Sequence, residues 1–165
     1  PRMVGVPRPR QHNGAVDVTA SLEAAVQADA LFEVVSDLGT YPDWLDIVPR
    51  AVSVDPDGSD VGPAWSVDLR GQIGPLRRSK RLRMVRTVAV PGELAVFERH
   101  EVDDRTHSDW ILRARIDVGA TPDESRLTME LHYGGSMWMP MLDRLLADEI
   151  ERSRGRLLAV LGVSS

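Results

Sequence analysis

The sequence lacks several residue types and patterns on which common protein functions depend. It contains no cysteine, which excludes disulfides, a thiol nucleophile and cysteine-ligated zinc or iron–sulfur clusters. The same absence fits a reducing compartment, so we expect a cytoplasmic protein. No run of about 18 apolar residues occurs, so the sequence predicts no membrane-spanning helix and no stable membrane insertion. The histidines, at positions 12, 100, 107 and 132, lack the close spacing of metal ligands, and we expect neither a metal site nor a cofactor.

What the chain does contain is typical of one globular domain. Its 165 residues are enough to bury a substantial core. Its composition, 42% hydrophobic and 27% charged, is typical of a soluble globular protein. The net charge of −5 argues against DNA binding. Residues 1–14 combine prolines with basic residues, a composition that predicts a mobile tail. We therefore expect a single domain over residues 15–165.

Hydrophobic periodicity predicts an α+β fold. Apolar residues alternate over 16–26, as in a half-buried strand, and recur at helical spacing over 137–162. Two short helices are expected after the first strand, near 28–38 and from Tyr41. Turn-forming residues then separate six strands, near 50–55, 62–70, 77–90, 93–102, 107–118 and 125–134. Short spacers imply hairpins, so the sequence predicts a curved seven-stranded antiparallel sheet around a long C-terminal helix, with a pocket between them.

The segment ADALFEVVSDLGTYPDWLDIVPRAVSV carries the pattern of a known superfamily. Asp37, Tyr41, Pro42 and Trp44 match its run of aspartate, short spacer, Tyr-Pro, any residue and Trp. The chain therefore resembles the START-like (SRPBCC, helix-grip) superfamily, above all its polyketide cyclase/dehydrase and lipid-transport group. The resemblance implies the helix-grip fold. It leaves the function open, because the superfamily includes cyclases, hydroxylase domains, lipid carriers, hormone receptors and ribosome-associated toxins.

Hairpin register predicts which side chains face the pocket. Taking Pro91-Gly92, the turn at 103–106 and the loop at 119–124 as hairpin tips fixes the strand pairing, and alternation then selects one face of each strand. That face includes Val88. The predicted ligand contacts on the strands are Trp65, Val67, Met84, Arg86, Phe97, Arg99, Trp110, Leu112, Met129, Leu131 and Tyr133. The last helix adds Trp138, Leu142, Leu145 and Leu146.

Arg86, Arg99 and Tyr133 are the polar members of this set. Buried arginines are rare unless they are paired. The two arginines could meet an oxygen of a ligand, pair with Glu101 or another internal acid, or lie at the open end of the sheet. By resemblance to cyclases they are also candidate catalytic groups, with the arginines stabilising a carbonyl or enolate and Tyr133 donating a proton.

Two further polar features admit both a functional and a structural interpretation. His100 and Asp109 are expected to be cross-strand neighbours on the outer face, where the pair could orient a general base. No serine or cysteine nucleophile is placed beside it, and such outer pairs are common. The basic strand at 77–86 could contact RNA or lipid headgroups. It could equally be a solvated face whose charges are balanced by acids on neighbouring strands, and it lacks interleaved aromatic residues for stacking on bases.

These observations support two hypotheses from different functional classes. In the first, the protein binds a hydrophobic small molecule, lipid-like or polyketide-like, in an internal cavity, either as a carrier or as a cyclase- or dehydratase-like enzyme. In the second, it is an interaction module resembling the ribosome-associated toxins, which uses the basic strand 77–86 and contacts the ribosome or RNA. Co-purification of a lipid-like molecule would favour the first hypothesis, and salt-dependent binding to ribosomes would favour the second.

Overall fold

The computed structural model describes residues 16–134 and 142–163. The predicted tail at 1–14, Trp138 and the first residues of the predicted C-terminal helix lie outside the described residues. Among the described residues, no helix is long and apolar enough to cross a membrane.

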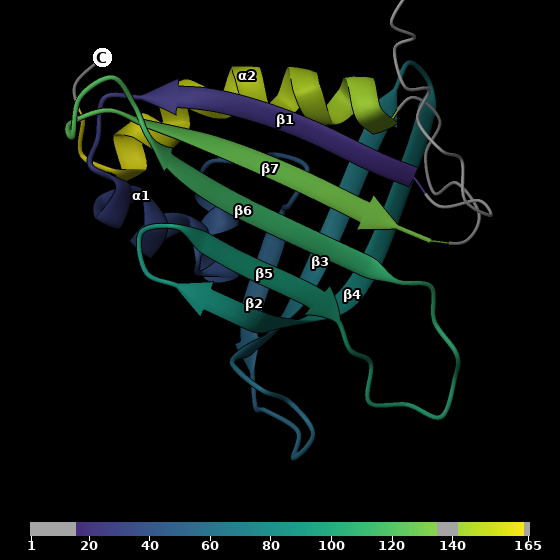
Figure 1. Ribbon diagram of the computed structural model, residues 1–165. Helices are drawn as coiled ribbons and strands as arrows, with labels where there is room; N and C mark the ends of the chain where they lie inside the picture. Colours follow the sequence, from purple (N-terminus) through teal and green to yellow (C-terminus); the bar gives the residue numbers. More distant parts are fainter. Residues whose placement is uncertain (1–15, 135–141, 164–165) are drawn as a thin grey trace, which may run out of the picture.

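Seven antiparallel strands form one curved sheet, in the order β1-β7-β6-β5-β4-β3-β2 (Figure 1). Two short helices follow the first strand, and a long helix ends the fold, which confirms the predicted α+β architecture. In chain order the elements are β1 (Val16–Ala24), α1 (Ala28–Val35), the 3-10 helix η1 (Leu38–Asp43), β2 (Arg50–Val54), β3 (Ala64–Ile73), β4 (Leu76–Val90), β5 (Leu94–Arg99), β6 (Trp110–Val118), β7 (Ser125–Tyr133) and α2 (Leu142–Val160).

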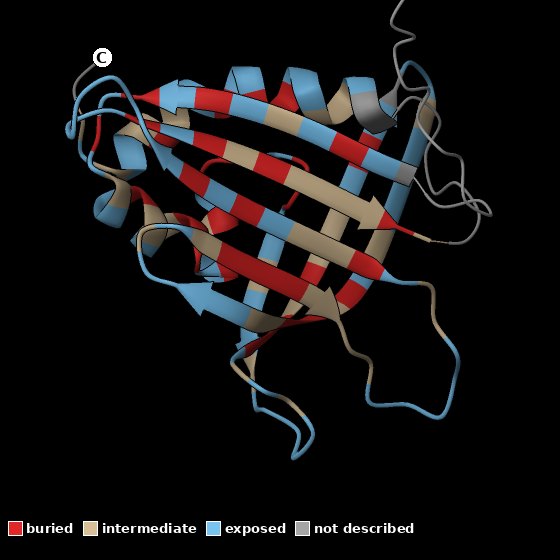
Figure 2. Cartoon of the chain, in the orientation of Figure 1, coloured by how far each residue is buried: buried red, intermediate tan, exposed pale blue. Residues whose placement is uncertain are grey.

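Alternation along the strands gives the sheet one buried face. On β1, Val18 and Leu22 are buried whereas Thr19 and Ser21 are exposed, because successive side chains of a strand point to opposite faces. Buried and exposed segments alternate visibly along β1 and β6 (Figure 2). The buried faces of the strands share one core cluster with α1, η1 and α2. The curved sheet therefore encloses its core on the side that holds the predicted pocket.

The predicted hairpin tips are confirmed, with one local correction. Gly92 has φ 74°, a left-handed conformation that glycine adopts without strain, and the amide of Glu93 donates to the carbonyl of Val90 at 3.0 Å. Beyond the tip, a bulge between Arg86 and Val88 shifts the register of β4 against β5. The prediction that Val88 faces inward is wrong, since the extra residue turns its side chain outward and leaves it 39% exposed.

The C-terminal helix packs its apolar stripe against the concave side of the sheet. Ile150 and Leu157 are only 4% and 0% exposed, as expected for the inner face of an amphipathic helix. The buried carboxylate of Glu149 ties α2 to the chain after η1. Its Oε1 accepts a hydrogen bond from the amide of Asp46 at 2.7 Å. Packing and this buried contact together hold the helix over the sheet.

Candidate functional site

An apolar cavity lies between the sheet, η1 and α2. It encloses about 100 Å³ of free space. Every side chain described on its wall is aliphatic, methionine or aromatic, so contact with this surface favours an apolar molecule. The lining residues are Val18, Ala20, Leu38, Tyr41, Leu45, Ile47, Val48, Val67, Leu69, Leu82, Met84, Trp110, Leu112, Met129, Leu131, Leu146 and Ile150.

The motif that carried the family resemblance builds one wall of this cavity. Asp37 caps η1, since its Oδ1 accepts from the amide of Gly39 at 2.8 Å. The hydroxyl of Tyr41 donates to the carbonyl of Val35 at 2.8 Å, and its ring packs on Trp44 at a centroid distance of 4.8 Å. Burial, reinforced by the charge of Asp37, raises the pKa of Tyr41 far above its usual range. Tyr41 is therefore a neutral wall residue.

Several predicted ligand contacts do line the cavity. They are Val67, Met84, Trp110, Leu112, Met129, Leu131 and Leu146. Trp65 and Phe97 are buried beside them but are not among the lining residues, and their rings pack edge to face at 5.7 Å. Leu145 lines a neighbouring groove instead. Trp138 and the side chain of Leu142 lie outside the described residues.

Sequence reasoning missed the wall formed by η1 and the residues that follow it. Leu38, Leu45, Ile47 and Val48 line the cavity, but their strand or helix periodicity is too short to predict a facing direction. β1 contributes Val18 and Ala20, which the alternation placed on the buried face. The density of apolar residues around the Tyr-Pro-x-Trp motif was the signal that could have identified this wall.

The two predicted inward arginines have partners other than the cavity. Arg86 donates from Nη1 to the carbonyl of Ser36 at 2.9 Å. Ser36 is the C-cap of α1, where a cation interacts favourably with the helix dipole. Arg99 pairs from Nε with Glu101 Oε1 at 2.9 Å, which confirms the pairing with Glu101 as one of the alternatives. Neither arginine is among the lining residues, and a role in ligand binding or catalysis stays a prediction for both.

Tyr133 and Trp110 form the aromatic end of the cavity. Their rings stack at a centroid distance of 4.9 Å, and Trp110 lines the cavity whereas Tyr133 packs behind it. The ammonium of Lys80 lies 5.8 Å from the centroid of the Trp110 ring, within cation–π range. Burial, with repulsion from Arg99, lowers the pKa of Lys80. Sequence reasoning did not single out Lys80, although alternation along β4 places it on the same face as Met84.

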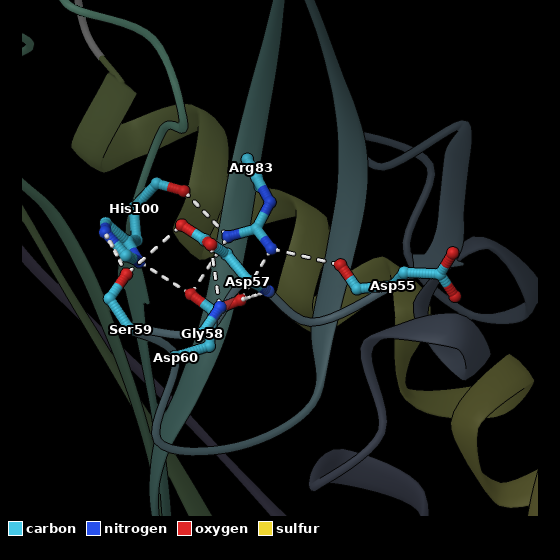
Figure 3. A network of polar contacts seen from close by, with 7 residues as sticks. All are labelled: Asp55, Asp57, Gly58, Ser59, Asp60, Arg83 and His100. Atoms are coloured by element: carbon cyan, nitrogen blue, oxygen red, sulfur yellow. Dashed lines mark hydrogen bonds and ion pairs between the residues drawn. The ribbon is translucent and has the colours of Figure 1, made fainter.

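His100 belongs to a network that differs from the predicted one (Figure 3). Its Nδ1 lies 2.6 Å from Asp60 Oδ1, a partner that the hairpin register did not predict, and Ser59 Oγ lies 3.5 Å from its Nε2. The carboxylate of Asp60 is fully buried and also receives a bidentate fork from Arg83, at 2.6 and 3.1 Å. These hydrogen bonds, with that of Arg83 the largest, hold the pKa of Asp60 well below its usual range.

The same geometry corrects the expectation that no serine lies near His100. Ser59 is a neighbour, but the cavity lining includes neither residue. What the network does is anchor the β2–β3 loop to β4. Among the described residues, no group of three or more His, Cys, Asp or Glu side chains is placed to hold a metal ion.

The basic strand is partly neutralised by its neighbours. Arg81 Nε lies 2.6 Å from Asp68 Oδ1 across the β3–β4 pair, and Arg83 pairs with Asp60. These contacts agree with the interpretation in which acids on adjacent strands balance the charge. Arg77 and Arg78, at the hairpin end, instead line a separate groove.

Comparison with known proteins agrees with this fold. Residues 15–162 match the family described as polyketide cyclase / dehydrase and lipid transport. A START superfamily protein from Mycobacterium smegmatis is 18% identical, with a TM-score of 0.64 over 88% of this chain and 97% of that chain. The ZhuI aromatase/cyclase from Streptomyces sp. R1128 is 16% identical, with a TM-score of 0.53 over 90% of this chain and 92% of that chain.

At such identities the solved structures establish the shared fold alone. No curated protein matches the chain. The family match covers nearly the whole sequence, and the helix-grip fold agrees with it. The chain therefore belongs to the polyketide cyclase/dehydrase and lipid-transport family, and it has a START-like fold.

Proposed function

We propose that this protein binds a small apolar molecule in the cavity between the sheet and α2, and that it carries or senses this molecule rather than transforming it. The observation that supports the proposal is the composition of the wall. Among the described lining residues there is no Asp, Glu, His, Lys or Arg. Acid–base catalysis most often uses a His, Asp, Glu or Lys side chain within hydrogen-bond reach of the reacting atom, and the hydroxyl of Tyr41 is already donated to the carbonyl of Val35.

The free volume narrows the class of ligand. About 100 Å³ is somewhat less than the roughly 150 Å³ of an engineered apolar cavity that binds benzene. Met84 and Met129 line this space, and their unbranched side chains can adapt to a ligand of somewhat different shape. A single apolar ring, or a short aliphatic segment of a larger molecule, is therefore the largest unit that we expect this cavity to admit. The family's cyclase and lipid-transport description and the aromatase/cyclase neighbour agree with an apolar or aromatic ligand.

The experiment that tests this proposal measures thermal unfolding with and without toluene. A ligand at ten times its dissociation constant stabilises the folded state by about 1.4 kcal/mol, which corresponds to roughly 3–6 °C for a chain of this size. We expect toluene to raise the unfolding temperature of the wild type by this amount. In Ala20→Leu the new side chain fills the cavity, and the shift should vanish although the variant stays folded.

The matched control places the same residue on the other face of the same strand. Thr19 on β1 is exposed, so Thr19→Leu should keep the full response to toluene. A wild type that shows no saturable stabilisation, or an Ala20→Leu variant that responds as the wild type does, would refute the proposed site.

A further inference from the structure

A basic groove lies immediately beside the apolar cavity. It has a volume of about 970 Å³ and lies between the β3–β4 hairpin, the chain after η1 and the first half of α2. Figure 1 shows the β3–β4 hairpin rising near the beginning of α2. The charged side chains that line the groove are four arginines and two carboxylates: Arg70, Arg77, Arg78, Arg152, Asp46 and Glu149.

Both carboxylates of the groove are already bound. Asp46 pairs with Arg156, whose hydrogen bond is the main reason that the pKa of Asp46 is lowered. Glu149 accepts from Arg152 at 3.1 Å and from the amide of Asp46 at 2.7 Å, and Arg156 lies 3.6 Å from it. The acids of the groove are therefore bound mainly by arginines of α2 and by the backbone, and the nearby charge of Arg70 also helps to lower the pKa of Asp46.

The arginines of the β3–β4 hairpin differ in their ion pairing. Those that line the groove from the hairpin are Arg70, Arg77 and Arg78. All three are exposed, and within residues 16–134 and 142–163 the structure shows no ion pair for any of them. Further along β4, Arg81 and Arg83 are each bound by an aspartate. On a chain whose net charge is −5, this end of the hairpin is a local positive site, which attracts anions.

The groove and the cavity share a wall. Ile47 lines both, and its carbonyl accepts a hydrogen bond from the amide of Arg70 at 2.8 Å. On α2, Leu146 and Ile150 face the cavity while Leu145 and Glu149, their neighbours in sequence, line the groove. A molecule seated in the cavity at Ile47 is thus adjacent to the groove, and alternation along β4 places Arg78 on the same face of the sheet as Leu82 and Met84.

We infer that the groove binds the anionic group of an amphiphile whose apolar part occupies the cavity. This inference rests on the proposed function and adds the ligand's chemical class: an apolar ring or chain that ends in a carboxylate or phosphate. The planar guanidinium of arginine matches such a group with paired hydrogen bonds. The apolar wall supplies contact area, and the arginines supply orientation and preference for charge.

The test compares phenylbutyrate with phenylbutyramide, its uncharged amide, by isothermal titration calorimetry. Both molecules carry the same ring and tether. We expect the carboxylate to bind the wild type about tenfold more tightly, the scale of one charge-assisted hydrogen bond. In the triple variant Arg70→Gln, Arg77→Gln, Arg78→Gln this advantage should fall to about twofold or less, while the affinity for the amide stays unchanged.

A matched triple variant controls for net charge. Arg105, Arg113 and Arg115 are also exposed but do not line the groove, so Arg105→Gln, Arg113→Gln, Arg115→Gln should preserve the tenfold preference. Equal affinity of the wild type for carboxylate and amide, or a preference that survives the loss of the groove arginines, would overturn the inference. If neither molecule binds and toluene does not bind either, the proposed function itself fails.

Two further arms identify the source of the anion. Inorganic phosphate alone should bind at least tenfold more weakly than phenylbutyrate, since it lacks the apolar part; comparable binding would show a free-anion site and overturn the inference. In a co-sedimentation assay, vesicles of phosphatidylglycerol should pellet no more protein than vesicles of phosphatidylcholine do. Co-sedimentation that requires the groove arginines, without a preference for the carboxylate, would assign the groove to a membrane surface instead.

Discussion

Replacing Asp60 with asparagine should destabilise the protein through the loss of one buried carboxylate. The side chain of Asp60 is 0% exposed and that of its partner Arg83 only 11%. The carboxylate also receives the amide of Asp57 at 2.7 Å and lies 2.6 Å from His100 Nδ1. Removing its charge leaves the nearly buried guanidinium with only neutral acceptors, among them the carbonyls of His100 and Asp55, which costs about 3 kcal/mol. We expect urea denaturation, followed by tryptophan fluorescence, to show a loss of that size.

Asp68 on β3 offers a matched control. Asp68 holds Arg81 with a similar fork, at 2.6 and 3.1 Å, but Arg81 is 68% exposed. Exposed pairs contribute little because water and salt screen them, so Asp68→Asn should change the free energy of unfolding far less. Equal losses in the two variants would refute the argument that burial makes the Asp60 anchor strong.

The same carboxylate predicts how stability depends on pH. Hydrogen bonds, with that of Arg83 the largest, lower the pKa of Asp60 in the folded state. A group with a lowered folded pKa stabilises the protein fully above its unfolded pKa, near 4, and the stabilisation is lost as the pH falls through the folded value. The difference in unfolding free energy between wild type and Asp60→Asn should therefore be constant near neutral pH and shrink below about pH 4. A difference that does not change on acidification would contradict this linkage.

Three further substitutions test other parts of the structure. Arg99→Met should lower the free energy of unfolding by about 1–3 kcal/mol, because Glu101 loses its ion-pair partner and keeps only the amide of Arg83. Calorimetric binding of toluene should stay unchanged; weaker binding at unchanged stability would show that Arg99 belongs to the ligand site. Glu149→Gln should cost about 2 kcal/mol in urea denaturation by weakening the contact between α2 and Asp46, and no loss would mean that packing alone holds the helix. Gly62→Ala should lower the unfolding temperature, since a Cβ there would lie 2.3 Å from the carbonyl oxygen of Arg86, whereas Gly58→Ala, with open space around it, should not; similar melting of both would disprove this close approach.

The sheet was predictable because each strand carries its own signal. Alternation reproduces the pairing of Met84 with Arg99 from the tip at Pro91-Gly92, and the pairing of Trp110 with Tyr133 from the loop at 119–124. Register propagates along regular strands, so one correct tip fixes many neighbours. It fails where a bulge inserts a residue, as at Val88, since local sequence does not mark the position of the bulge.

The site was predicted less completely, because strand alternation does not predict which distant segment a long polar side chain contacts. Arg86 extends to the carbonyl of Ser36 at the end of α1, a contact between segments 50 residues apart that no periodicity reveals. His100 pairs with Asp60 for the same reason, since the β2–β3 loop folds back along β4. The groove at Arg70, Arg77 and Arg78 depends on where α2 and the chain after η1 meet the hairpin, and that geometry exists only in the folded protein.

Methionine methyl NMR tests the central claim, occupation of the apolar cavity, most directly. The chain has six methionines, of which Met84 and Met129 line the cavity from β4 and β7. In protein labelled with 13C at the methionine methyl groups, toluene should shift the Met84 and Met129 signals saturably and with a single dissociation constant. In Ala20→Leu both signals should stay where they are at every toluene concentration. Toluene that leaves the Met84 and Met129 signals of the wild type unmoved would contradict the account.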